Sequence, residues 1–445
     1  MTDESTSAEY KKKLSEAIAF HRAGELTDAE RCYMDVLKME PEQSDALQLL
    51  GVVSAQMGNT ALAIQRVRQS IAINPDQPGA LNNLGNMLAE EKQYDEAIEA
   101  YQRAIHLRPD DGPAHQNLGH VFSLADRPLD AIKAYRRATE LQSENASAWD
   151  SLGESLQKVG RSEEAVTSFR KALELAPEYT SIMDRLGKSL RILGRLEEAR
   201  EVYQQWLTMM PDHPIASHYL IVCDQSVDVP DRASKDYVKK TFDDFADDFD
   251  SRLADLAYRA PELLGQKISQ LVTDDQRGTW NVVDLGCGTG LCGRFLRDVA
   301  KKLVGVDLSP KMLAKADERH LYDELVEAEL TEYLDGCRGD QDLLLSADTL
   351  IYIGDLQSTF TAASRALRPG GYLVFSLEKL VDMPERSDGH DGFRLGASGR
   401  YMHRESCVRE WLAASGFEVL DFVEAEVRRE GLQCVIGFLV TAVIH

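Results

Sequence analysis

The sequence predicts an all-α solenoid of helical repeats followed by an α/β domain with a parallel sheet. Three observations support this order. Landmark residues recur every 34 positions through the first half of the chain, as at Pro41, Pro75 and Pro109. Short apolar runs then alternate with helical stretches, which is the pattern of a parallel sheet covered by helices. A glycine-rich loop, at 286–293, directly follows the first of these runs.

Composition excludes several classes of function. The 445 residues are enough for about two to four domains, each with its own core. Fifty Lys and Arg residues stand against 74 Asp and Glu residues, and the formal charge of −24 predicts no nucleic-acid partner and no binding to acidic membranes. The seven cysteines show no zinc-type spacing, so we expect no metal site. Because the N-terminus lacks the apolar core of a signal peptide, we expect a cytoplasmic protein.

The repeat is visible at several kinds of position. A Leu-Gly pair recurs with an Ala twelve residues after its Gly and, in most units, an aromatic residue four positions further on. Small residues at this spacing let two helices cross closely, and the aromatic residue lies one turn along the same face. The pairs begin at Leu50, Leu84, Leu118, Leu152 and Leu186, and the alanines are Ala63, Ala97, Ala131, Ala165 and Ala199.

This pattern resembles the tetratricopeptide repeat (TPR). The resemblance implies six units that begin near residues 10, 44, 78, 112, 146 and 180, followed by a capping helix at 215–223. We assign residues 1–225 to this TPR solenoid, 226–235 to a linker and 236–445 to a second domain. Glu16-Ala17 replaces Leu-Gly in the first unit, which fits a solenoid whose terminal faces are capped or docked.

In TPR arrays the residues that flank Leu-Gly face a concave groove. Side-chain amides in such a groove can pair with the backbone of an extended peptide, so we expect the array to bind a protein or peptide. The alternatives are a solvated surface without a fixed ligand and a surface for self-association, which leaves a homo-oligomer possible. The expected peptide-binding residues are Asn82, Asn83, Asn86, Gln116, Asn117 and His120.

The second domain centres on the loop after the predicted strand 282–285. Asp284 stands near the end of that strand, and alternate glycines follow it, which lets a ligand approach the backbone closely. Asp307 ends the next predicted strand, where its carboxylate can accept hydrogen bonds from both ribose hydroxyls of an adenosine. The glycines at 288, 290 and 293 also match the GxGxxG pattern of NAD-binding proteins. The acid at 284, however, suits a cationic amino group better than a pyrophosphate.

The acid-x-Gly-x-Gly-x-Gly segment resembles the first motif of class I S-adenosylmethionine (SAM) methyltransferases. The resemblance implies a Rossmann-like domain with a seven-stranded sheet and SAM as the cofactor. Predicted strands at 303–306, 343–346 and 372–376 follow the first one. A hairpin of strands 417–423 and 434–443, joined by a turn at 428–431, then closes the sheet.

The same resemblance implies a role for each residue near the loop. Asp284 would hold the amino group of SAM, the glycine backbone would pass under its methionine portion, and Asp307 would bind the ribose. Aromatic residues at helical spacing in 242–253 imply a helix that lies over the cofactor, the alternative being a stripe that faces the core. The expected cofactor-binding residues are Asp284, Gly286, Gly288, Gly290, Asp307, Leu308, Met312, Glu329, Leu330 and Asp348.

The methyl acceptor should meet SAM at the end of the fourth predicted strand. Methyl transfer needs alignment and, for an acceptor that carries a proton, a base, for which Tyr352 and His403 are candidates. A loop is expected at 379–404, and its Arg394 and Arg400 could hold an acidic acceptor. The alternative is that these arginines neutralise neighbouring acids.

Three functions fit the sequence. The first is a SAM-dependent methyltransferase whose array binds a protein partner or a protein that is itself methylated. The second is a methyltransferase for a small molecule, such as a carboxylate or a hydroxyl compound, whose array only localises or oligomerises it. The third, a SAM-binding scaffold without turnover, is disfavoured because the glycine loop and both acids are intact.

Overall fold

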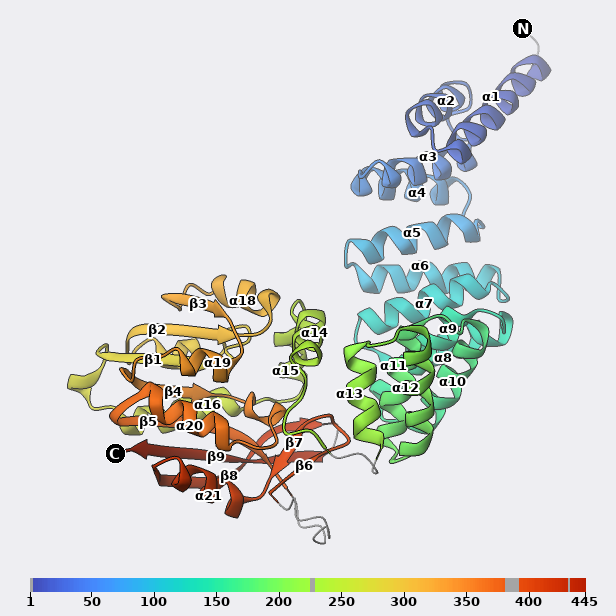
Figure 1. The fold of residues 1–445 in the computed structure, drawn as a ribbon. Helices are drawn as coiled ribbons and strands as arrows, with labels where there is room; N and C mark the ends of the chain where they lie inside the picture. Colours follow the sequence, from blue (N-terminus) through green and yellow to red (C-terminus); the bar gives the residue numbers. More distant parts are fainter. Residues whose placement is uncertain (1–2, 225–228, 381–391, 431–432) are drawn as a thin grey trace. The chain divides into compact units, whose positions relative to one another are not determined.

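The computed structural model describes residues 3–224, 229–380, 392–430 and 433–445. The chain divides into two compact units, Met1–Ser189 and Leu190–His445. Figure 1 shows the helices of the first unit as successive antiparallel pairs. The helices up to the α/β domain are α1 (Asp3–Ala23), α2 (Leu26–Met39), α3 (Ser44–Gln56), α4 (Thr60–Ile73), α5 (Pro78–Glu90), α6 (Tyr94–Leu107), α7 (Gly112–Leu124), α8 (Pro128–Leu141), α9 (Ala146–Lys158), α10 (Ser162–Leu175), α11 (Thr180–Ile192), α12 (Leu196–Met209) and α13 (Pro214–Cys223).

Each repeat is held together where its two helices cross at the Leu-Gly pair. In the fifth repeat, the ring of Phe169 on α10 lies over Gly153 on α9, so that a Cβ on Gly153 would come within 2.5 Å of the ring. Gly85 and Gly119 meet Tyr101 and Tyr135 in the same way. The alanines of the 34-residue pattern are fully buried beside these rings. The pattern therefore encodes a small residue against a large one at these crossings.

The second unit contains a sheet covered by helices on both faces. No helix among the described residues is long and apolar enough to cross a bilayer. The elements after α13 are α14 (Lys235–Phe245), α15 (Phe249–Asp255), α16 (Ala260–Leu271), η1 (Asp274–Gln276), β1 (Trp280–Leu285), α17 (Gly293–Leu296), β2 (Ala300–Asp307), α18 (Pro310–Asp317), β3 (Glu324–Glu327), α19 (Leu330–Asp335), β4 (Gln341–Ser346), η2 (Leu350–Tyr352), α20 (Gln357–Ala366), β5 (Leu367–Lys379), β6 (Phe393–Leu395), β7 (Tyr401–His403), α21 (Glu405–Ala414), β8 (Phe417–Glu430) and β9 (Gln433–Ile444).

The strand order places the ends of the parallel strands along one edge. The order is β3-β2-β1-β4-β5-β7-β6, with β9 antiparallel to β5 and β8 antiparallel to β9. Strands β1 to β5 run parallel, so their carboxyl ends share the edge at which ligands bind in such sheets. This arrangement confirms the predicted α/β fold behind a helical array. The sheet has nine strands among the described residues rather than the seven expected, because β6 and β7 extend it.

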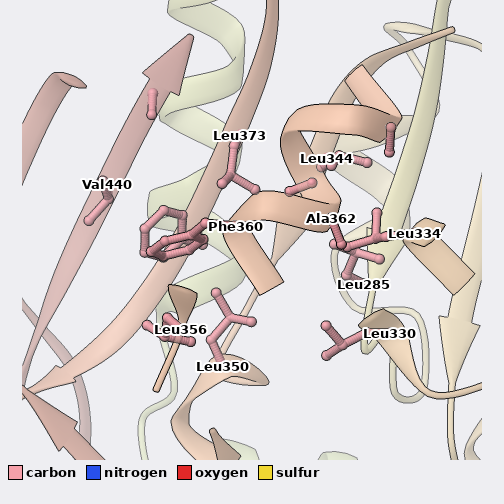
Figure 2. Close-up of a cluster of buried hydrophobic side chains, with 14 of the residues drawn as sticks. Leu285, Leu330, Leu334, Leu344, Leu350, Leu356, Phe360, Ala362, Leu373 and Val440 are labelled. Carbon is pink, nitrogen blue, oxygen red and sulfur yellow. The ribbon is translucent and has the colours of Figure 1, made fainter. Parts of the chain in front are cut away.

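Apolar side chains alternate between the two faces of the sheet. Val283 and Leu344 point to the face that α20 covers with Phe360, and Figure 2 shows this cluster. Val282 and Leu343 point to the opposite face, where Leu264 of α16 packs. Because both faces are buried, the strands read as continuous apolar runs in the sequence.

Two predictions about the end of the chain are wrong. The segment 428–431 is not a turn up to Glu430, because β8 continues through it and Arg428 lies within the strand. The segment 379–404 is not a simple loop, because its second half forms the antiparallel pair of β6 and β7. Residues 381–391 of this predicted loop lie outside the described residues.

Helix α13 packs on the α/β part of the second unit. The ring of His218 stacks on Tyr237 of α14 at 3.7 Å, and its Nε2 donates to the carbonyl of Gly399 at 2.9 Å. The guanidinium of Arg191 lies 3.6 Å from the ring centre of Tyr219 and donates to the carbonyl of Ala397. These contacts explain why residues from 190 onward, which the sequence assigns to the array, form one unit with the sheet.

We predict that Gly153→Ala destabilises the array because the new methyl group must displace the buried Phe169 ring. Gly79→Ala is the matched control, since a Cβ there meets Gln48 only at 3.6 Å. Both variants replace a helical glycine with alanine, so the difference between their free energies of unfolding, measured by urea denaturation, should be about 1–3 kcal/mol and reflect mainly the clash at Gly153. Equal unfolding midpoints would contradict the packing described for the crossing.

Candidate functional site

The glycine loop after β1 is shaped by a residue that follows β4. Gly286 has a φ of +71°, a conformation that other residues rarely adopt. A Cβ at this position would also collide with the side chain of Thr349, which follows β4. The Thr349 hydroxyl donates to the Gly286 carbonyl at 3.3 Å. The loop therefore needs glycine for both its backbone conformation and its contact with the next strand.

Asp307 connects the end of β2 to this loop. Its Oδ2 accepts a hydrogen bond from the backbone N–H of Gly288 at 2.9 Å, and its Oδ1 accepts one from Ser309 at 2.9 Å. Burial raises the pKa of this carboxyl, and the backbone hydrogen bonds oppose the shift. Each oxygen keeps a lone pair that can accept a hydroxyl donor from a ligand.

Asp284 is a buried carboxyl with one oxygen left unpaired. Its Oδ2 accepts a hydrogen bond from the Tyr322 hydroxyl at 2.7 Å, while its Oδ1 is buried without a hydrogen-bond partner among the described residues. Burial, together with the nearby Asp307 carboxylate, raises the pKa of Asp284 to about 7. An acceptor in this state is satisfied by a cationic donor, so the site fits an ammonium group placed beside the loop.

The other expected cofactor residues near Asp307 are three apolar residues, which differ in burial, and Glu329, which caps a helix. Leu308 is half-buried beside Asp307, whereas Met312 is fully buried. Leu330 is part of the core below the sheet edge. Glu329 is the N-cap of α19, where its Oε2 accepts hydrogen bonds from the N–H groups of Thr331 and Glu332, and it also pairs with Arg232. These contacts hold the Glu329 carboxylate at the start of α19, and its contact with the cofactor stays a prediction.

Helices α14 and α15 contact the glycine loop and its surroundings. Asp243 accepts a hydrogen bond from the hydroxyl of Ser309 at 2.6 Å. Asp250 accepts one from the hydroxyl of Thr289 at 2.6 Å and pairs with Arg319. The ring of Phe249 lies 3.8 Å from the position of a Cβ on Gly288. The segment that the sequence assigns to a cofactor-covering helix thus packs on the loop.

The two candidate bases have different surroundings. His403 is fully buried, and its Nε2 donates to the carbonyls of Ile353 and Gly354 at 2.9 and 3.1 Å. It therefore holds the chain after β4, and we do not retain it as a base. Tyr352 lies beside Phe242, with ring centres 5.5 Å apart, and receives a hydrogen bond from Arg400. Burial raises the pKa of Tyr352, which keeps its hydroxyl protonated.

Charged residues gather next to Tyr352. Asp348 and Glu378, at the ends of β4 and β5, both pair with Arg428, which is only 3% exposed. Arg400 also pairs with Glu378, at 3.4 Å, which supports the alternative that it neutralises an acid. Arg394 lies on β6, opposite Met402.

Sequence reasoning did not identify several residues at this edge. Arg428 comes from β8, which reaches β5 only through β9, and Ser376 and Glu378 lie on β5 itself. Tyr258 is brought there by two backbone hydrogen bonds, from Arg259 to Val427 and from Arg429 to Leu256. No local pattern in the sequence marks these residues, because strand pairing between distant segments brings them together.

The expected groove residues form contacts between successive repeats. The Asn117 amide donates to Asn82 and Asn86 at 3.3 and 3.2 Å, and the Tyr101 hydroxyl also donates to Asn86. Asn83 and Gln116 are partly exposed, and His120 is exposed. The amides therefore form a connected set that spans two repeats, of which part is accessible.

Two kinds of family model match this chain. A family model described as a methyltransferase domain matches residues 283–375. Models described as tetratricopeptide repeats match residues 14–78, 78–111 and 144–212. The chain thus carries TPR units and a methyltransferase domain, which confirms both resemblances found in the sequence.

Two curated relatives are similar to part of this chain. The ubiquinone biosynthesis O-methyltransferase of Thiobacillus denitrificans is 34% identical over 102 residues, 21% of this chain and 43% of that protein. A malonyl-acyl carrier protein O-methyltransferase of Enterobacter lignolyticus is 34% identical over 104 residues, 23% of this chain and 41% of that protein. The chain spans less than half the length of these relatives.

Two solved structures are similar to part of this chain. MamA is 27% identical and is similar over 37% of this chain and 96% of its own, with a TM-score of 0.35. YrrB, described as a TPR protein with an unusual peptide-binding site, is 20% identical and is similar over 42% of this chain and 96% of its own, with a TM-score of 0.39.

We predict that Asp284 makes stability depend on pH. Burial raises the pKa of the folded carboxyl from its ordinary value of 3.8 to about 7. Between these values the folded state binds more protons than the unfolded state, so the free energy of unfolding falls as the pH rises from about 4 to about 7. Asp284→Asn removes this decrease. Without ligand, the free energy of unfolding of the variant should therefore rise by a few kcal/mol relative to that of the native protein between about pH 4 and 7.

The measurement is urea denaturation of both proteins at a series of pH values. His218 and His403, whose pKa values burial lowers to about 4, produce the opposite slope between about pH 4 and 6.5. This slope is present in both proteins and cancels in their difference. If the free energies of unfolding of the two proteins differed by the same amount at every pH, Asp284 would not be an unpaired buried carboxyl.

Proposed function

We propose that this chain is a SAM-dependent methyltransferase whose TPR array binds a protein partner or a protein substrate. The observation that carries the proposal is the buried Oδ1 of Asp284, which has no hydrogen-bond partner among the described residues. It lies beside a glycine loop in which any side chain at position 286 would collide with Thr349. A ligand with a cationic amino group at one end and a ribose at the other matches Asp284 and Asp307 together.

The residues of this chain have separate tasks in the proposed reaction. Asp284 binds the ammonium group of SAM, and Asp307 accepts the ribose hydroxyls. The backbone at Gly286 and Gly288 would lie along the methionine portion, where a side chain would block the approach of the ligand. SAM supplies a methyl group that is already activated on its sulfonium, so the protein contributes alignment and the exclusion of water. The contacts of α14 and α15 with the loop support that exclusion.

The proposed partner is a protein because the array presents amides that match a peptide backbone. Two repeats are joined by the hydrogen bonds among Asn82, Asn86 and Asn117, and an extended peptide can exchange hydrogen bonds with the partly exposed amides beside them.

The second candidate function is a small-molecule methyltransferase. It is favoured by the names of the curated relatives, such as the ubiquinone biosynthesis O-methyltransferase.

We predict that Asp307→Ala weakens SAM binding by at least about 100-fold, because two hydrogen bonds from the ribose to a carboxylate are lost. Isothermal titration calorimetry with SAM measures the affinity. Asp317→Ala, on the exposed face of α18, is the matched control and should bind SAM like the native protein. Unchanged affinity of Asp307→Ala would contradict the SAM site, and tight binding of NAD by the native protein would favour the other reading of the glycine pattern.

The two candidate functions differ in where the methyl group goes. With methyl-labelled SAM added to a cell extract, a protein substrate places label in the protein fraction. We predict that the double variant Asn83→Ala, Asn117→Ala reduces this labelling several-fold, because peptide capture is lost while SAM binding is not. Gln102→Ala, an exposed position on α6, is the matched control. Label found only below the size cutoff would contradict a protein substrate and support the small-molecule candidate.

A further inference from the structure

Asp348 has an unusual backbone conformation at the end of β4. Its φ is +50°, in the left-handed region, which aspartate adopts more readily than most residues other than glycine. The Ser376 hydroxyl fixes it twice, because it accepts the N–H of Asp348 at 2.8 Å and donates to Oδ1 of the same residue at 2.6 Å. A carboxylate that its neighbours hold this firmly at the ligand-binding edge of a sheet is well placed to act on a ligand.

Arg428 fixes the other oxygen of this carboxylate. Its Nη1 donates to Oδ2 of Asp348 at 2.9 Å, and its Nη2 donates to Glu378. The β8 strand carries a bulge between Glu426 and Arg428, and such a bulge changes the direction of the strand at the point where the Arg428 side chain projects. Asp348 is therefore oriented by two different strands, through Ser376 of β5 and Arg428 of β8.

This carboxylate lies directly beside the proposed SAM site. The next residue, Thr349, contacts Gly286 of the glycine loop and donates to its carbonyl at 3.3 Å. Tyr258 lies across from Arg428, because its segment is hydrogen-bonded to β8 on both sides of that residue. Burial raises the pKa of Tyr258, and the Asp348 carboxylate raises it further, which agrees with a hydroxyl close to Asp348. Asp348 thus lies between the loop that would hold SAM and the side chains around Tyr352.

The charges around Asp348 indicate the class of acceptor. Two carboxylates, Asp348 and Glu378, face two guanidinium groups, of Arg428 and Arg400, and these four groups are paired with one another. An acidic acceptor would meet two carboxylates and arginines that already have partners. An amine would be held as an ammonium ion, which has no lone pair for attack. A neutral hydroxyl, in contrast, can donate a hydrogen bond to a carboxylate and be activated by it.

We propose that Asp348 is the base for a neutral, hydroxyl-bearing acceptor, with Ser376 and Arg428 as positioning residues; the proposal rests on the SAM-dependent methyl transfer proposed above. The acceptor oxygen forms a bond to the methyl carbon as the bond from that carbon to sulfur breaks. The electron pair of the broken bond stays on sulfur, which becomes a neutral thioether. The hydroxyl proton passes to Asp348 and then to solvent.

The test uses the full chain, methyl-labelled SAM and an extract of the source cells as the supply of acceptors. We expect the labelled product to be a methyl ether, which is stable to base and is identified by mass spectrometry. Asp348→Asn should lower the rate of transfer by about 100-fold or more, because asparagine keeps the shape but cannot take the proton. Its SAM affinity, measured by calorimetry, should stay within about twofold of the native value.

Asparagine is chosen because it tolerates the left-handed conformation at this position. Asp340→Asn, an exposed acid directly before β4, is the matched control and should retain both transfer and SAM binding. If Asp348→Asn melts at a clearly lower temperature, Ser376→Ala provides a second test. It removes the hydroxyl that orients the carboxylate and should lower the rate about tenfold without changing SAM affinity.

Several results would overturn the proposal. A base-labile methyl ester would identify a carboxylate acceptor, and a methylamine would identify an amine. A full transfer rate in Asp348→Asn would exclude this residue as the base, and a loss of SAM binding in the variant would assign it to the SAM site instead. If the native protein binds SAM but transfers no label, the scaffold reading holds and both proposals fail. If it does not bind SAM, the proposed function fails first.

Discussion

The carboxylate of Asp307 joins the ends of two strands, and the arrangement above the sheet edge depends on that connection. One oxygen holds the N–H of Gly288 and the other holds the N–H of Ser309. Ser309 in turn is the N-cap of α18 and donates its hydroxyl to Asp243 of α14. The Asp307 side chain thus helps to fix the path of the glycine loop and the start of α18. Through Ser309 it also fixes the contact with α14, so a change in one of these segments would affect the other two.

Buried carboxylates are unpaired on one side of the candidate site and paired with arginines on the other. On the loop side, the Oδ1 of Asp284 has no partner, and the free energy of that burial is recovered only when a cationic group arrives. On the β8 side, the carboxylates of Asp348 and Glu378 are already paired with arginines. An unpaired acceptor favours binding of a cation, whereas a paired and oriented one favours a fixed geometry. Such a division suits a site with a charged donor and an uncharged acceptor.

The sequence reveals those parts of the structure that depend on local spacing. The crossing of Gly153 and Phe169 can be read from the repeat because both residues belong to one helical hairpin. Asp284 and Asp307 can be found because each ends a strand of a short βαβ pattern. Arg428 could not be found, since its polar neighbourhood, Arg-Arg-Glu-Gly, resembles a turn. It lies within a strand because acids from β4 and β5 neutralise it, and nothing nearby in the sequence indicates that pairing.

The packing of His218 on Tyr237 and on the carbonyl of Gly399 has an evolutionary consequence. A Cβ on Gly399 would come within 3.2 Å of His218 Nε2 and closer still to Tyr219, so a larger residue there would displace the helix. The hairpin of β6 and β7 is therefore covered by side chains encoded near the end of the repeats. Substitutions in α13 and in this hairpin must therefore be compatible with one another, so α13 cannot change independently of the α/β domain.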